Sequence, residues 1–129
     1  MTHVTDTHSM IWYLRADPRF REPARQALAD PNASIVIPSI VLAEVAFLHA
    51  RGRIAVDLPS LLTHVDRTAN CYVYPFNEAV ARLLPIGLEI HDAMIVATAL
   101  LLKQAMGQQV ALITRDQEIT ASGLVPVIW

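Results

Sequence analysis

The stretch that decides the fold is Ser34-Ile35-Val36-Ile37. Its run of β-branched residues favours an extended strand, and the lack of polar alternation predicts that both faces of the strand are buried. A turn signal, Asp30-Pro31-Asn32, precedes it. Pro38-Ser39 opens a helix that we expect to end at Gly52, a good residue beyond a helix C-terminus. The stretch therefore predicts a buried strand within a sheet.

The same alternation of elements continues along the chain. Short apolar runs predict further strands at residues 4–5, 71–76, 110–113 and 125–128. The segments between them predict helices at residues 9–14, from about 18 to 29, and at 58–68, 77–84, 92–106 and 117–121. Strands that alternate with helices imply an α/β fold whose parallel sheet is covered on both faces. No repeat or linker divides the chain, so we expect one domain over residues 1–129.

The composition predicts a partner. Of the 129 residues 53% are hydrophobic and only 17% are charged. Surplus apolar surface on a small domain often lies in an oligomer or partner interface. We therefore expect a homodimer or a bound partner protein, with the helix around Met10, Ile11 and Trp12 as a candidate contact surface.

The formal net charge of −2 gives no overall signature of nucleic-acid binding. All basic residues except Lys103 are arginines, however, and several are clustered, at positions 15, 19, 21 and 25 and again at 51 and 53. The planar guanidinium group donates two hydrogen bonds to a phosphate. The clusters are thus either solvated surface or contacts for a phosphate backbone.

Cys71 is the only cysteine, so no intrachain disulfide and no cysteine-based metal site can form. We interpret it as a small core residue. The N-terminus shows no signal peptide, and the apolar run Ala93–Leu102 is too short to span a bilayer. We expect a soluble protein of a reducing compartment, the cytoplasm, without membrane contact.

Two acidic residues follow predicted strands. Asp6 comes after Val4-Thr5, and Asp116 comes shortly after the run that ends at Ile113. Sites in open parallel sheets form beyond the carboxyl ends of the strands, so both side chains would lie at that rim. The simpler interpretation is that each acid only caps a helix, or that Thr114 and Gln117 form a capping box with Asp116 in the first turn.

Two further acids lie on predicted helices. The helical neighbours of Glu44 include Val41, Phe47 and Leu48, so its carboxylate is expected on an apolar stripe that faces the protein. Unpaired acids are rarely buried, which favours a nearby metal ion or arginine. Asp92 begins the longest predicted helix, where N-capping alone would explain it.

Taken together, the four acids Asp6, Glu44, Asp92 and Asp116 predict a metal-dependent nuclease. Carboxylates gathered at one place repel one another unless a cation holds them. Carboxylate oxygens suit Mg²⁺ or Mn²⁺, which would polarise a phosphate and help generate hydroxide. The five histidines lack zinc-motif spacing, although His8 and His91 adjoin the acids as candidate supporting groups.

Four motifs carry a resemblance to a known family. Asp6-Thr7-His8-Ser9-Met10-Ile11-Trp12-Tyr13-Leu14 resembles the opening of PIN-domain toxins of the VapC type. Three further segments resemble the second, third and fourth motifs of that family. In chain order they are Ser39-Ile40-Val41-Leu42-Ala43-Glu44, His91-Asp92-Ala93-Met94-Ile95-Val96-Ala97-Thr98-Ala99 and Leu112-Ile113-Thr114-Arg115-Asp116. Their order and spacing agree over nearly the whole chain.

The resemblance implies a three-layer α/β/α sandwich with a central parallel sheet. It also implies Mg²⁺- or Mn²⁺-dependent endoribonuclease activity and inhibition by a cognate antitoxin protein. By position, Asp6, Glu44, Asp92 and Asp116 would be the catalytic, metal-binding residues, and Thr114 a supporting hydroxyl. A PIN-type nuclease that processes RNA without an antitoxin is the alternative within the family.

Two other classes of protein compete with this interpretation. A phosphatase of the haloacid dehalogenase type also begins with an acid after its first strand. It requires a second aspartate two positions later, where this chain has His8. A noncatalytic interaction module would explain the apolar composition, but it would not explain Glu44 on an apolar helix face.

Overall fold

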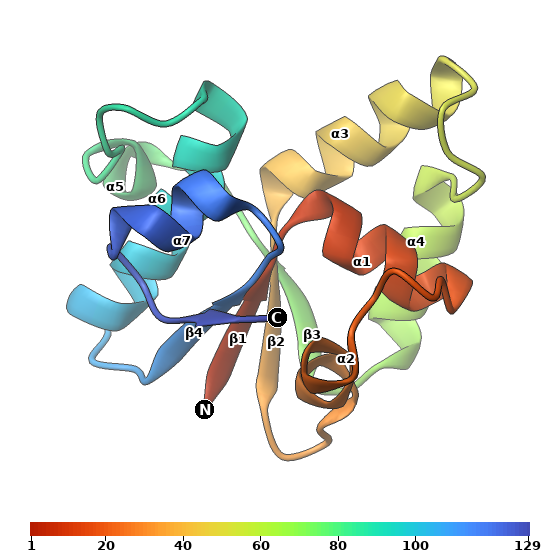
Figure 1. The fold of residues 1–129 in the computed structure, drawn as a ribbon, viewed down its shortest axis with the longest axis horizontal. Helices are drawn as coiled ribbons and strands as arrows, with labels where there is room; N and C mark the ends of the chain where they lie inside the picture. Colours follow the sequence, from red (N-terminus) through yellow and green to blue (C-terminus); the bar gives the residue numbers. More distant parts are fainter.

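The computed structural model describes all residues, 1–129, and contains a five-stranded parallel sheet (Figure 1). Its strands are β1 (Thr2–Thr5), β2 (Ser34–Pro38), β3 (Cys71–Tyr74), β4 (Val110–Ile113) and β5 (Val127–Ile128). They lie in the order β3-β2-β1-β4-β5, and all four neighbouring pairs are parallel. The α/β class and the parallel sheet predicted from the sequence are confirmed.

The centre of the sheet is built from the β-branched runs. In the register of the three central strands, Val4 of β1 lies between Val36 of β2 and Leu112 of β4. None of these three side chains has any exposed surface. Parallel strands buried on both faces are usually apolar, as β4 is throughout. β1 differs, because Thr2, His3 and Thr5 are buried polar residues, and His3 Nδ1 hydrogen-bonds with the Ala27 carbonyl oxygen at 3.0 Å.

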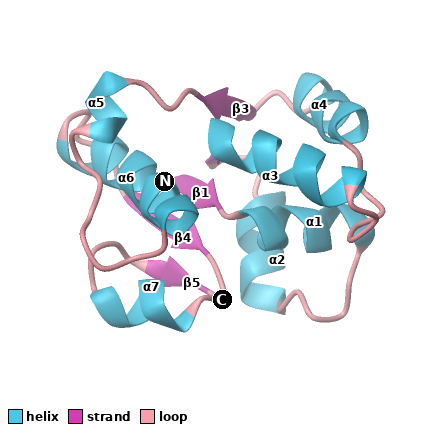
Figure 2. Cartoon of the chain, turned by 90° about the horizontal axis from the view of Figure 1, so that it is seen from above, coloured by secondary structure: helices cyan, strands magenta, loops and turns pink.

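Helices cover both faces of the sheet. In the view from above, α1 to α4 lie on one side of the strands and α5 to α7 lie on the other (Figure 2). The helices are α1 (Thr7–Arg15), α2 (Glu22–Ala29), α3 (Ser39–Ala50), α4 (Leu58–Arg67), α5 (Glu78–Ala81), α6 (Ile90–Gln104) and α7 (Gln117–Ser122). This is the three-layer arrangement that the family resemblance implied.

Two strands are shorter than predicted, and proline explains both differences. β3 ends at Tyr74 instead of residue 76, because Pro75 has no N–H to continue the ladder. β5 begins at Val127 instead of residue 125, because Pro126 cannot donate either, although its carbonyl accepts a hydrogen bond from Leu112 N–H at 2.8 Å.

The predicted partner surface around Met10, Ile11 and Trp12 is wrong. These side chains are only 1%, 5% and 5% exposed and belong to the main hydrophobic core. Helix α1 packs its apolar face inward, so it cannot present these residues to a partner.

Cys71 is buried, as predicted, and burial raises the pKa of its thiol to about 11. Every helix is too short, or not apolar enough, to cross a lipid bilayer.

The topology creates one switch point in the sheet. From β1 the chain passes through α1 and α2 to β2, whereas from β4 it passes through α7 to β5, on the opposite side. The connections therefore diverge between the adjacent carboxyl ends of β1 and β4 (Figure 1). A crevice at such a point is where open α/β sheets place their sites.

Candidate active site

Asp6 leaves β1 and caps helix α1. Its Oδ1 accepts a hydrogen bond from Ser9 N–H at 2.9 Å, which satisfies one of the free amides of the first turn. Its Oδ2 accepts a hydrogen bond from the Thr114 hydroxyl. The capping interpretation of Asp6 therefore holds, but capping uses only one of the two oxygens. Each oxygen also keeps lone pairs that could bind a further group.

Asp116 occupies the matching position after β4. It is the N-cap of α7, and its Oδ1 accepts a hydrogen bond from Ile119 N–H at 2.9 Å. The predicted capping box of Thr114 and Gln117 is wrong, because Asp116 itself is the cap. Thr114 instead accepts a hydrogen bond from Asp116 N–H at 3.0 Å while donating to Asp6. This fully buried hydroxyl joins the two strand ends.

Asp92 is not an N-cap, contrary to the sequence-based expectation. Helix α6 begins two residues earlier, at Ile90, because Glu89 takes the capping role. The Glu89 carboxylate accepts hydrogen bonds from the amides of His91 and Asp92, at 2.9 and 3.3 Å. The carboxylate of Asp92 itself accepts no hydrogen bond from the protein, so capping does not account for this acid.

The electrostatic environment of Asp92 opposes its ionisation. The pKa of this carboxyl is raised from 3.8 to about 6, mainly by burial and to a smaller extent by the negative charges of neighbouring acids. In decreasing order of effect, these neighbours are Asp116, Glu89, Asp6 and Glu44. Acids that are distant in sequence therefore act on Asp92 through space.

Three of the four predicted site acids line one pocket. Asp6, Asp92 and Asp116 share a pocket of about 430 Å³ at the switch point of the sheet. None of them is in an ion pair. The other lining residues are His8, Ser9, Trp12, Arg19 and Arg115.

Glu44 lies beside this pocket and not in its lining. Its Oε1 accepts a 2.7 Å hydrogen bond from the hydroxyl of Thr7, the residue after Asp6. The sequence-based prediction that the stripe around Glu44 faces the core is wrong. The core-facing stripe of α3 is formed by Val41 and Val45, and Glu44 is only partly buried.

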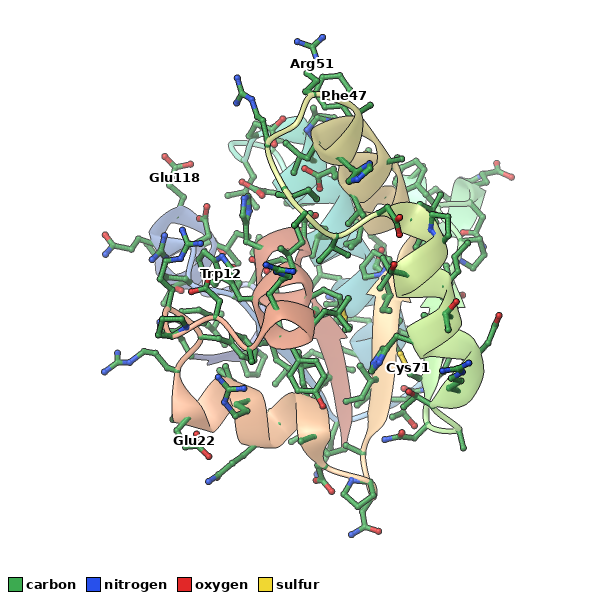
Figure 3. The ribbon with its side chains drawn as sticks, turned by 90° about the vertical axis from the view of Figure 1, so that its right-hand side faces the viewer. Trp12, Glu22, Phe47, Arg51, Cys71 and Glu118 are labelled. Carbon is green, nitrogen blue, oxygen red and sulfur yellow. The ribbon has the colours of Figure 1, made fainter.

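The neighbours of Glu44 form an apolar groove. Phe47 is 57% exposed and its ring lies 4.5 Å from the guanidinium carbon of Arg51, the residue that follows α3. Both side chains lie at the outer end of the helix (Figure 3). A groove of about 450 Å³ contains Glu44 and Phe47 together with Ile40, Ala43, Leu48 and His91. The two histidines that adjoin the acids therefore differ, because His8 lines the acidic pocket and His91 lines this groove.

The pocket also contains two arginines that the sequence did not place beside the acids, although Arg19 belongs to one of the predicted arginine clusters. Arg19 and Arg115 both lie over the indole ring of Trp12, with guanidinium carbons 4.9 and 4.7 Å from its centroid. Arg19 comes from the loop after α1, and Arg115 comes from the loop after β4. The sequence analysis also did not predict that Thr7 contacts Glu44. The only signal for this contact in the sequence is that a residue with a hydroxyl group directly follows Asp6.

Residues 4–122 match the profile of the PIN domain, a range that includes all four predicted site acids. The chain belongs to the PIN domain family. This confirms the family indicated by the four sequence motifs. Among curated proteins, no sequence matches the chain.

Solved structures share the fold. VapBC2 from Rickettsia felis, bound to a DNA fragment from its promoter, has a TM-score of 0.66 and 15% identity, over 98% of this chain and 97% of that chain. VapBC-1 from nontypeable Haemophilus influenzae has a TM-score of 0.63 and 21% identity, over 98% of this chain and 96% of that chain. Sequence identities of 15% and 21% show that the fold is shared.

The pocket suits a hard divalent cation by its donor chemistry. Its carboxylate oxygens are the ligands that Mg²⁺ and Mn²⁺ prefer, and no arginine neutralises them through an ion pair. As the side chains are placed, however, no group of three or more His, Cys, Asp or Glu residues is arranged to hold one ion. Binding would therefore require the carboxylates to turn toward one another, a movement that their mutual repulsion opposes without a cation.

The pKa of Asp92 predicts a pH-dependent effect on stability. Folding raises this pKa from 3.8 to about 6, so the folded protein loses stability as pH rises through this interval. We expect Asp92→Asn, measured in chelator, to raise the melting temperature above about pH 7 and to lose this advantage near pH 4. Thermal unfolding at both pH values measures the effect.

Asp66→Asn is the matched control, since it makes the same change on the exposed face of α4. It should lack the large gain in stability above neutral pH. Equal melting curves for Asp92→Asn and the wild type above about pH 7 would contradict the electrostatic assignment.

Proposed function

We propose that this PIN-domain chain is a metal-dependent endoribonuclease and the toxin of a toxin–antitoxin pair. The observation that carries the proposal is the pocket that Asp6, Asp92 and Asp116 line together, with no ion pair to any of the three. A structural protein has no use for such repulsion, whereas an enzyme that hydrolyses phosphodiesters with a metal ion needs carboxylates at one place to bind that ion.

Asp6, Glu44, Asp92 and Asp116 would hold Mg²⁺ or Mn²⁺. When bound, the ion would polarise the scissile phosphate and lower the pKa of an attacking water. The raised pKa of Asp92 supports its assignment, because a cation would relieve the unfavourable charge there. Glu44 joins the set because its charge acts on Asp92 and Thr7 holds it next to Asp6.

Thr114 is the positioning residue of this site. Its hydroxyl donates to Asp6 and accepts from the amide of Asp116, so it fixes one carboxylate and the backbone of the other. Ser9 adds to this support, since its amide binds Asp6 and its hydroxyl donates to the Ile113 carbonyl at 3.1 Å. These contacts hold Asp6 and the backbone of Asp116 close together, so that the two carboxylates need only turn to reach a common ion.

The partner assignment rests on two observations. The sequence motifs resemble VapC-type toxins, and the fold is that of the chains in the VapBC2 and VapBC-1 structures. A cognate antitoxin is therefore the proposed inhibitor. The groove of Ile40, Ala43, Phe47 and Leu48 beside Glu44 offers it apolar surface next to the acids. Homodimerisation is proposed on composition alone.

Cleavage of RNA tests the proposed reaction. The wild type should cut single-stranded or loop RNA in Mg²⁺ or Mn²⁺ and should be inactive in chelator. Asp92→Asn keeps the shape of the side chain and removes a ligand charge, so its rate should fall by more than about 100-fold. Gel analysis of a mixed RNA pool measures the rates, with Asp66→Asn as the surface control.

Double-stranded RNA should be a poorer substrate, because its deep and narrow major groove hides the bases. Equal cleavage by the wild type and Asp92→Asn would indicate a contaminating nuclease and would remove the support for the proposed activity.

A second prediction concerns Thr114. Thr114→Val preserves the shape of the side chain but removes both hydrogen bonds, so activity and Mn²⁺ affinity should each fall about 10- to 100-fold. Thr114→Ser keeps the hydroxyl and should restore most of both. Kinetics and Mn²⁺ titration measure these effects, and circular dichroism checks the fold. Wild-type Mn²⁺ affinity in Thr114→Val would show that the hydroxyl does not position the ligands.

A further inference from the structure

A second, basic pocket adjoins the acidic one. It has a volume of about 330 Å³ and shares three lining residues, His8, Trp12 and Arg19, with the acidic pocket. Two more arginines line it, Arg15 from the end of α1 and Arg53 from the loop between α3 and α4. The two pockets therefore form one continuous depression in which carboxylates give way to guanidinium groups.

The positive charge of the second pocket is only partly neutralised. Its one acid, Asp17, is held by Arg19 through hydrogen bonds of 3.0 Å from Nε and 2.8 Å from Nη2. Arg15 and Arg53 form no ion pair. Three guanidinium groups thus face one carboxylate, and two of them remain free for an anion.

Trp12 lies between the two pockets and lines both of them. Its ring lies beneath the guanidinium groups of Arg19 and Arg115, and it also packs against the ring of Trp129 with centroids 5.7 Å apart. In Figure 3 it lies between α1 and α7. A buried ring that contacts two guanidinium groups limits their freedom, so both are partly ordered before a ligand arrives.

This arrangement revises the expectation from the sequence. The run of arginines from Arg15 to Arg25 does not form one surface. Arg25 lies over the ring of Phe20, 5.7 Å from its centroid, and lines neither pocket. Arg53, which is distant in sequence, lies beside Arg15 and Arg19 instead.

We propose that the pocket of Arg15, Arg19 and Arg53, the arginine groove, binds backbone phosphates of single-stranded RNA next to the cleaved bond. This rests on the proposed function, since the scissile phosphate is taken to lie at the acids. A strand that crosses from the acidic pocket past Trp12 places its following phosphates against the free guanidinium groups. Arginine binds phosphate through two parallel hydrogen bonds, and a positive groove follows a strand without reading its sequence.

RNA binding in chelator tests the arginine groove separately from catalysis. The probe is a fluorescent oligouridylate of about ten nucleotides, a length within the range of known single-strand sites. We expect the double variant Arg15→Ala/Arg53→Ala to bind about tenfold more weakly at low salt, and the slope of log affinity against log salt to decrease by about 1.4. Fluorescence anisotropy over a salt series measures both quantities.

Arg67→Ala is the matched control, because Arg67 is exposed on α4, forms no ion pair and lines no pocket described above. It should leave both the affinity and the salt slope close to those of the wild type. Arg53→Ala alone should show about half of the loss in slope, which guards against a folding defect from the change at Arg15.

The outcomes separate this proposal from the proposed reaction. If RNA is cleaved in Mg²⁺ but the double variant binds as Arg67→Ala does, the arginine groove is wrong and the nuclease stands. If the double variant weakens RNA binding but no RNA is cleaved, the nuclease is wrong, and the arginine groove stands only as a binding site for RNA phosphates. A third outcome uses an oligoglutamate peptide as a second probe. If the double variant binds RNA as the wild type does but binds this peptide more weakly, the groove binds an acidic protein segment, and the proposal is overturned.

Discussion

Three carboxylates, those of Asp6, Asp92 and Asp116, line one pocket with no ion pair to offset their charge, and the charges of Asp6 and Asp116 oppose the ionisation of Asp92. The fold brings this repulsion about. Parallel pairing of β1 with β4 places Thr5 beside Ile113, so the residues that follow both strands leave the sheet at the same edge. Helix α6 then carries Asp92 to the same place.

The neighbouring polar contacts hold this unfavourable arrangement together. Amides at the starts of α1 and α7 donate to Asp6 and Asp116, and the buried Thr114 hydroxyl links the two loops. Arg19 and Arg115 line the same pocket but are held at Trp12, not in ion pairs with the acids. The arginines of the pocket therefore do not neutralise the carboxylates, which remain available to a metal ion.

The sequence predicted the sheet and the acids of the pocket because both depend on local patterns. The β-branched run before Pro38 predicts a buried strand. An acid that follows a strand within a few residues, as Asp6 and Asp116 do, lies at the carboxyl end of that strand. The direction of Glu44 could not be predicted in this way. Helix α3 is apolar on nearly all sides, so its pattern does not reveal which stripe faces the core. Arg53 and Arg15 line the same pocket because segments distant in sequence meet there, so no local sequence pattern could predict that they are neighbours.

The most direct measurement is a crystal structure grown with Mn²⁺ and recorded at a wavelength that gives anomalous scattering from manganese. If the carboxylates exist to bind a metal ion, a peak will lie among Asp6, Asp92 and Asp116, and their side chains will have turned toward it. The metal-dependent interpretation would be contradicted if the pocket contained no peak and the three carboxylates kept their separate positions at a saturating concentration of Mn²⁺.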